Sequence, residues 1–190
     1  MKFRTLTLIA TIGALGLAAC GSDDTASPAT QATDAAFNDA DVAFAQGMIP
    51  HHEQAIEMAD IALDPTVGAS EQVRDLATRI KGGQDPEITM MGGWLTMWGQ
   101  PMQMDMGDGH DMSAMDGMMS VEDMDMLGAA TGAEFDSLWL DMMIRHHQGA
   151  IAMAQTVKAS GSNADVLALA DQVIAAQQAE ITEMESLLGS

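Results

Sequence analysis

The feature that most restricts the fold of this 190-residue chain is an internal duplication. The stretch MIPHHEQAIEMA at residues 48–59 returns as MIRHHQGAIAMA at residues 143–154, after a shift of 95 positions. A second stretch, QDPEITMM at residues 84–91, returns as QQAEITEM at residues 177–184, after a shift of 93. Such long-period similarity indicates two copies of one supersecondary unit, which bury their apolar faces against each other.

Within each copy the apolar residues recur at the spacing of amphipathic helices, and no segment has the alternation of a strand. Four helices are predicted, at residues 38–63, 70–99, 132–159 and 163–188. Thr131 and Glu134 have the spacing of a capping box at the start of the third helix. Gly82-Gly83, followed by Asp85-Pro86, predicts a kink or a short break in the second. The expected class is all-α, an antiparallel four-helix bundle made of two duplicated helical hairpins with a long middle loop.

The N-terminus has the features of an export signal. Lys2 and Arg4 precede a short apolar run that is too short to span a membrane, so residues 1–19 are predicted to be a signal peptide. The sequence LAAC at residues 17–20 resembles the lipobox of bacterial lipoproteins, which implies that Cys20 carries lipid. The alternative is an ordinary signal peptide followed by a chance cysteine. We expect an exported protein, lipid-anchored to the cell envelope on the periplasmic face or the outer surface of a membrane.

The mature chain divides into a tether and one folded domain. Residues 20–37 are small and polar and predict a flexible tether, and residues 38–190 form the bundle domain. The domain comprises repeat one at 38–100, a methionine-rich connection at 101–130 and repeat two at 131–190. Because Cys20 is the only cysteine, the chain can form neither an internal disulfide nor a cysteine metal site.

The chain is strongly acidic, with a formal net charge of −21. Such a field repels nucleic acid and attracts cations, so nucleic acid is excluded as a partner. Solubility outside the cell is an equally adequate reason for the acidity.

Paired histidines next to methionine are the most specific chemical feature of each copy. On a helix, Met48 lies one turn before both His51 and His52, while the two imidazole rings diverge by about 100°. Two copies packed about a pseudo-twofold axis would bring both sets together, which predicts a metal site. The candidate ligands are Met48, His51, His52, Met143, His146 and His147, with Asp41, Asp136, Met58 and Met153 on the same helical stripes. Core packing of the methionines and ordinary hydrogen bonding of the histidines are the alternative.

The connection between the copies carries nine methionines without helical period, which core packing does not explain. Thioethers suit Cu(I) and form no disulfides in an oxidising compartment, so this segment predicts a copper trap. Its candidate ligands are Met102, Met104, Met106, His110, Met112, Met115, Met118, Met119, Met124 and Met126. We expect residues 101–119 to be poorly ordered without metal. The alternatives are an adaptable surface for a protein partner and a sacrificial target of oxidation.

The two M-x-x-HH-x-x-A-I-x-M-A motifs, each followed by Q-x-x-EI-x-x-M, resemble the bacterial family called domain of unknown function 305. The resemblance covers roughly residues 39–188. It implies an exported, ferritin-like four-helix bundle, and copper binding and copper tolerance are associated with some members. The second copy departs from the first by Arg145 in place of Pro50, Gln148 in place of Glu53 and Gly149 in place of Gln54, which argues against a strictly symmetric site.

The functional prediction is a copper-binding envelope lipoprotein that buffers, delivers or confers tolerance to Cu(I), with another transition metal as the alternative cargo. A second hypothesis is a ferritin-like, metal-dependent redox enzyme. Its usual Glu-x-x-His motifs are absent from the sequence, although Glu87 and Glu180 could each supply one carboxylate. A third is a methionine-rich interaction bundle without metal. The expected partners are a metal ion and a membrane, with a second copy of the chain or a copper-accepting protein as further candidates.

Overall fold

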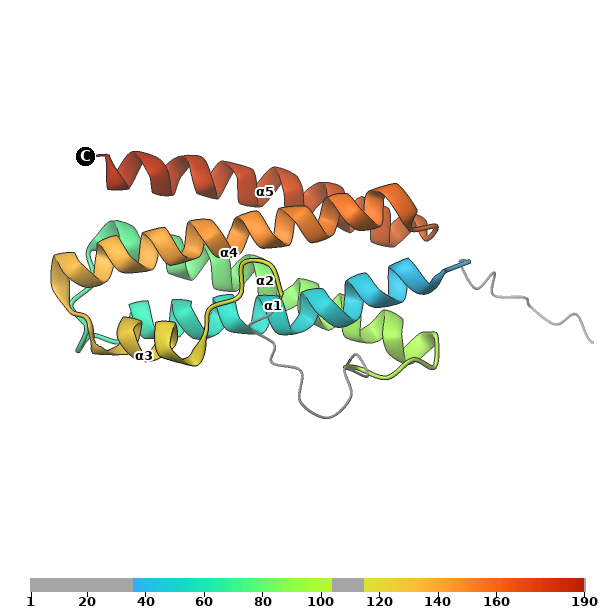
Figure 1. Ribbon diagram of the computed structural model, residues 1–190, viewed down its shortest axis with the longest axis horizontal. Helices are drawn as coiled ribbons and strands as arrows, with labels where there is room; N and C mark the ends of the chain where they lie inside the picture. The colour runs from blue at the N-terminus through green and yellow to red at the C-terminus, as the bar shows by residue number, and fades with distance from the viewer. Residues whose placement is uncertain (1–35, 104–114, 190) are drawn as a thin grey trace, which may run out of the picture. The chain divides into compact units, whose positions relative to one another are not determined.

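A computed structural model describes residues 36–103 and 115–189. These residues form five helices and no strand: α1 Asp39–Leu63, α2 Glu71–Met97, α3 Val121–Ala129, α4 Gly132–Ser160 and α5 Ala164–Leu188 (Figure 1). The four long helices confirm the predicted all-α class, and their ends lie within two residues of the predicted ones. The predictions for the signal peptide, Cys20 and most of the tether fall outside the described residues. No described helix is long and apolar enough to cross a membrane.

Side-chain caps fix where α1 and α5 begin. The Asn38 side chain accepts hydrogen bonds from the N–H groups of Ala40 and Asp41, and the Asp41 carboxylate accepts one from the N–H of Asn38. Asn163 caps α5 in a similar way. The capping box predicted at Thr131 is wrong, because the Thr131 side chain makes no capping hydrogen bond to α4.

The short break that was one of the two outcomes predicted between Gly82 and Pro86 does not occur, because α2 runs unbroken through these residues. The kink stays a prediction. A proline inside a helix removes one N–H donor and crowds the carbonyl four residues earlier, which here belongs to Gly82. Both residues lie on the exposed face of α2, where the affected carbonyl remains accessible to water. Ile80 and Leu95, on either side, are buried in the core and hold both halves of the helix.

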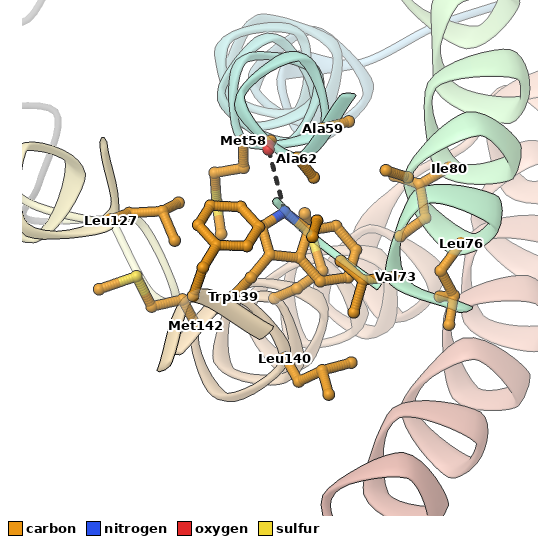
Figure 2. Close-up of a cluster of buried hydrophobic side chains, with 14 of the residues drawn as sticks. Met58, Ala59, Ala62, Val73, Leu76, Ile80, Leu127, Trp139, Leu140 and Met142 are labelled. Atoms are coloured by element: carbon orange, nitrogen blue, oxygen red, sulfur yellow. Dashed lines mark hydrogen bonds between the residues drawn. The ribbon is translucent and has the colours of Figure 1, made fainter. Parts of the chain in front are cut away.

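The core consists of two apolar clusters, to each of which all four long helices contribute. The first, the Trp139 cluster, contains Ala55, Met58, Ala59, Ala62, Val67, Ala69, Val73, Leu76, Ala77, Ile80, Met119, Leu127, Ala130, Phe135, Trp139, Leu140, Met142, Met143, Ile181 and Met184. Figure 2 draws part of this cluster, in which the Trp139 indole N–H donates to the carbonyl oxygen of Met58 at 2.9 Å. The second, the Phe44 cluster, contains Phe44, Ala45, Met48, Ile49, Met91, Trp94, Leu95, Ala150, Ala154, Val157, Val166, Leu169, Ala170 and Val173. Equivalent residues of the two copies fall in opposite clusters, as Met91 and Met184 do. The two hairpins are therefore related by a pseudo-twofold axis.

Part of the methionine-rich connection is ordered, which corrects the prediction of a long loop. Ser120 and Asp123 form a capping box that opens α3, and Leu127 of α3 is fully buried in the Trp139 cluster. Met124 packs against the same cluster, whereas Met126 is about half exposed. One buried leucine therefore anchors a short helix in a stretch whose methionines have no clear period.

Candidate metal centre

A layer of polar side chains separates the two apolar clusters. His51 and His52 follow the Phe44-cluster residues of α1 and precede those of the Trp139 cluster, and His146 and His147 occupy the equivalent place on α4. All four imidazoles are fully buried, and Gln84 of α2 and Gln177 of α5 are buried beside the same boundary. We call these six residues the histidine layer. Since buried polar groups need hydrogen-bond partners or a ligand, this layer requires an explanation.

The pseudo-twofold axis brings the rings of His51 and His146 into contact. Their ring centroids lie 3.8 Å apart with the planes tilted by 44°, and the centroids of His146 and His147 lie 6.4 Å apart. The duplication therefore does bring histidines from both copies into one region, as the sequence predicted. The contact is made across α1 and α4, which pack directly against each other.

The second histidine of each pair, His52 or His147, contacts a glutamate. In the sequence these glutamates were considered only as ligands of an enzyme. His52 Nε2 lies 2.6 Å from Glu87 Oε2, and His147 Nε2 lies 2.8 Å from Glu180 Oε2. Each glutamate side chain is about one-fifth exposed, at 20% and 19%. The signal that could have found these pairs was present, because both residues of each pair recur in both copies.

Burial keeps the imidazoles of His51 and His146, the two rings in contact, neutral. Desolvation, followed by the charge of His52, lowers the pKa of His51 to about 3. The pKa of His146 is held well below its ordinary value by desolvation and then by His51 and His147. At neutral pH both rings therefore keep a lone pair on one nitrogen, which is the form that binds metal ions.

Several buried ring nitrogens in the histidine layer lack a hydrogen bond of normal geometry. They are Nδ1 of His51, His52, His146 and His147, together with Nε2 of His146. Unpaired buried nitrogens on four neighbouring histidines fit the donor set of a transition-metal ion. Within the described part of the chain, no three side chains of the His, Cys, Asp and Glu types are arranged to hold an ion alone. Thioethers would therefore have to complete the coordination.

Buried methionines are available at both borders of the layer. Met48 and Met143 are fully buried one turn before His51 and His146, in opposite apolar clusters. Met58 is also fully buried, but it lies seven residues beyond His51, about 10 Å along the helix. Its counterpart Met153 is partly buried against the Phe44 cluster. The structure thus brings Met48 and Met143 closer to the histidines than the other two candidates.

Asp41 and Asp136 lie at opposite ends of the bundle, away from the histidines. The Asp41 carboxylate accepts hydrogen bonds from the N–H groups of Ser162 and Asn163, and that of Asp136 accepts from the N–H of Ser70. Each aspartate therefore fastens the turn of the other hairpin. These contacts assign the two carboxylates a structural role at the ends of the bundle.

The described end of the methionine-rich connection is packed against the histidine layer. We call residues 115–119 the strap. The carbonyl oxygen of Asp116 lies 3.3 Å from His51 Nε2, and the Gln54 amide exchanges two hydrogen bonds with the backbone of Met119, at 2.9 and 2.7 Å. The expectation that this part of the connection is poorly ordered is therefore wrong. Met104, Met106, His110 and Met112 lie outside the described residues.

Two glycines allow the strap to approach α4 closely. A Cβ atom added at Gly149 would lie 2.0 Å from the Asp116 carbonyl oxygen, and one added at Gly117 would lie 2.8 Å from that of Arg145. Gly117 also has a φ of +83°, which favours glycine. The equivalent of Gly149 in the first copy is Gln54, which binds the strap. The strap is a single segment, so the two copies use different residues at this position to hold it.

The other methionines of the connection have varied surroundings. Met119 is buried in the Trp139 cluster, and Met115 and Met118 are half-buried in the strap. Met102 is about half exposed at the other end of the connection, close to Gly92. Core packing therefore explains Met119, but not the exposed methionines.

Comparison with known proteins agrees with this architecture. The pattern of the family described as Domain of unknown function (DUF305) matches residues 41–188. A candidate secreted DUF305 protein from Streptomyces coelicolor is 32% identical with a TM-score of 0.71, over 83% of this chain and 94% of its own. A DUF305 fragment from Deinococcus radiodurans gives the same identity and TM-score, over 80% of this chain and 97% of its own.

A third similar structure carries metal. CopM in its Cu(II)-bound form is 32% identical with a TM-score of 0.65, over 78% of this chain and 95% of its own. CopM also has Cu(I)-bound, silver-bound and apo structures that match this chain. A comparison with curated protein sequences gives no match. With a family pattern that spans nearly all of the bundle and these similar structures, the chain belongs to the DUF305 family.

Proposed function

We propose that this protein binds copper, as Cu(I), in the cell envelope, and that it buffers or delivers the ion rather than transforming a substrate. The observation that carries the proposal is the histidine layer, where fully buried imidazoles, those of His51 and His146 kept neutral by desolvation, have nitrogens without hydrogen bonds beside buried thioethers. Imidazole and thioether together form a donor set that suits Cu(I). The copper- and silver-bound forms of CopM support the same class of ion.

The proposed centre uses Met48, His51, His52, Met143, His146 and His147. All six lie on α1 or α4, and helical positions hold ligands more rigidly than loops do. Asp41 and Asp136 are not part of the centre, because their carboxylates are taken up by backbone N–H groups. The methionines of the connection, with His110, are proposed as a second and more adaptable store.

Export and lipidation are part of the proposal. The apolar run and LAAC sequence at the N-terminus support processing before Cys20 and attachment of lipid to it. The similar candidate secreted protein from Streptomyces coelicolor supports export. Outside the cytoplasm, thioethers keep their affinity for Cu(I) where thiols would be oxidised.

The redox-enzyme alternative has less support from the geometry. A di-iron site needs inward carboxylates that are free to bridge two ions. Glu87 and Glu180, the carboxylates considered for that role, are hydrogen-bonded to His52 and His147 and reach the surface. We therefore propose a binding protein.

The test is an anaerobic titration of the protein with Cu(I) in competition with bicinchoninate, followed by metal analysis. Replacing His51 and His146 by leucine should remove the tighter class of sites and leave the methionine store. Replacing Met102, Met104, Met106 and Met112 by leucine should remove the weaker class. The exposed Gln148→Ala variant serves as the control on α4. If the protein binds no Cu(I), or if both sets of variants bind like the wild type, the methionine-rich interaction bundle becomes the better hypothesis.

A further inference from the structure

Three of the four buried histidines share one pattern of contacts. In His51, His52 and His147, Nε2 faces an oxygen atom, while Nδ1 has no hydrogen-bond partner. The oxygen belongs to the Asp116 carbonyl for His51 and to glutamates for the other two. His146 is the exception, because neither of its nitrogens makes a hydrogen bond of normal geometry.

These oxygens determine which nitrogen carries the proton in a neutral ring. A backbone carbonyl and a carboxylate can only accept a hydrogen bond, so Nε2 of His51, His52 and His147 must be the donor. A second proton on Nδ1 would leave a buried N–H without a partner, which is unfavourable. The lone pair of each ring therefore remains on Nδ1.

We propose that the Asp116 carbonyl, Glu87 and Glu180 are positioning groups that fix His51, His52 and His147 as the Nε2–H tautomer, so that Nδ1 is the nitrogen that each of these rings offers to a metal ion. This inference rests on the proposed function and specifies the atoms that perform it. A carboxylate behind a ligating imidazole orients the ring and raises its basicity, and its loss commonly costs 10–100-fold in metal affinity. The partly exposed glutamates thus act on the ion through the buried rings.

The two halves of the centre are predicted to differ at His51 and His146, the two histidines whose rings are in contact. His51 is fixed by the strap, whereas the acceptor that acts on His146, its counterpart, is the backbone of His51, with which His146 makes no hydrogen bond of normal geometry. The strap sits on one side because Gln54 binds it and Gly149 leaves room for it. Docking of the strap therefore sets the tautomer of one ligand of the pair and not of the other.

The first test needs no metal. Long-range ¹H–¹⁵N spectra of the metal-free protein at neutral pH should show protonated Nε2 and unprotonated Nδ1 for His51, His52 and His147. Glu87→Ala should convert His52 to a mixture of tautomers, while Glu87→Gln, whose amide oxygen still accepts, should preserve the pattern. Glu183→Ala, at an exposed glutamate three residues beyond Glu180, is the control. Protonated Nδ1 in the wild-type spectra would overturn the inference.

The strap has its own variant and its own control. Gly149→Ala places a Cβ 2.0 Å from the Asp116 carbonyl oxygen and should displace the strap, so the His51 signals should change while those of His52 do not. Gly93→Ala adds the same methyl group to a helical glycine with nothing within 4 Å and should change neither. Unaltered His51 signals in Gly149→Ala would overturn the role of the strap.

The second test is Cu(I) affinity by competition with bicinchoninate. The Glu87→Ala/Glu180→Ala variant should bind about 10–100-fold more weakly than the wild type, and the corresponding glutamine variant should recover most of the loss. Wild-type affinity in the alanine variant would overturn the positioning role alone. If the wild-type protein binds no Cu(I), the proposed function fails and the ligand role fails with it, whatever tautomers the spectra show.

Discussion

Acidification of the metal-free protein is expected to destabilise the fold through its two central histidines. Burial lowers the pKa of His51 from 6.5 to about 3, and it lowers that of His146 in the same direction. In the unfolded chain both rings titrate near the ordinary value. Between these two pKa values the unfolded state binds protons that the folded state refuses, so stability falls as the pH falls through this window.

The magnitude follows from the two pKa values of His51. Each pH unit within the window costs up to about 1.4 kcal/mol per histidine. Between pH 7 and pH 4.5, His51 alone would lower the free energy of unfolding by about 2.5 kcal/mol. His146 adds to this loss with the same sign. For a domain whose whole stability is about 5–15 kcal/mol, the effect is large.

The assay is urea unfolding at constant ionic strength, at several pH values between 7 and 4.5, with a chelator present. The His51→Leu/His146→Leu variant should lose less stability on acidification than the wild type, because the carboxylates titrate in both proteins and only the histidines differ. Gln84→Leu is the matched control, since it removes a buried polar group of the same layer that does not titrate. Equal losses of stability in the wild type and the double histidine variant would refute the reasoning.

Three further predictions concern individual side chains. The double variant Met48→Leu/Met143→Leu keeps the volume of the core, so the free energy of unfolding should change by less than about 1.5 kcal/mol per site. Its Cu(I) affinity should fall, and unchanged affinity in the competition assay would exclude both thioethers as ligands. Asp41→Ala should lower the free energy of unfolding by about 2–4 kcal/mol, because it leaves buried N–H groups without an acceptor, but should not alter Cu(I) affinity. A drop in affinity beyond that of a destabilised control would return Asp41 to the candidate ligands. Cys20→Ser should release the protein from the membrane fraction or block its processing, and unchanged partition would contradict lipidation.

The sequence predicted the long helices well because their signals are local and repeated. Asn38 and Asp64-Pro65 mark the ends of α1, and the same apolar period occurs in both copies. Pro86 does not end α2, because a helix tolerates proline when its exposed side can adjust and its buried side remains packed. α3 was missed because its stability depends on Leu127 reaching the Trp139 cluster, a tertiary contact that a short stretch does not reveal.

The candidate site was predictable in its residue types but only partly in its contacts. The duplication was enough to place His51 near His146, since symmetry brings equivalent positions together. It also contained both members of the pairs His52–Glu87 and His147–Glu180. Because His52 recurs as His147 and Glu87 recurs as Glu180, the repeats could have suggested that each histidine contacts the glutamate of its own copy. The position of the strap could not be predicted this way, because the strap is a single segment that contacts both copies and has no counterpart in the repeat.

The shared construction of the two apolar clusters makes the bundle one cooperative folding unit. Each hairpin supplies one end of its helices to the Trp139 cluster and the other end to the Phe44 cluster, so neither hairpin contains a complete core. A hairpin expressed alone would expose half of each cluster to water along one face, and its two histidines, which are buried in the whole bundle, would lie at the centre of that exposed face. Chains cut between the copies are therefore expected to refold only by bimolecular association, at a rate that depends on protein concentration.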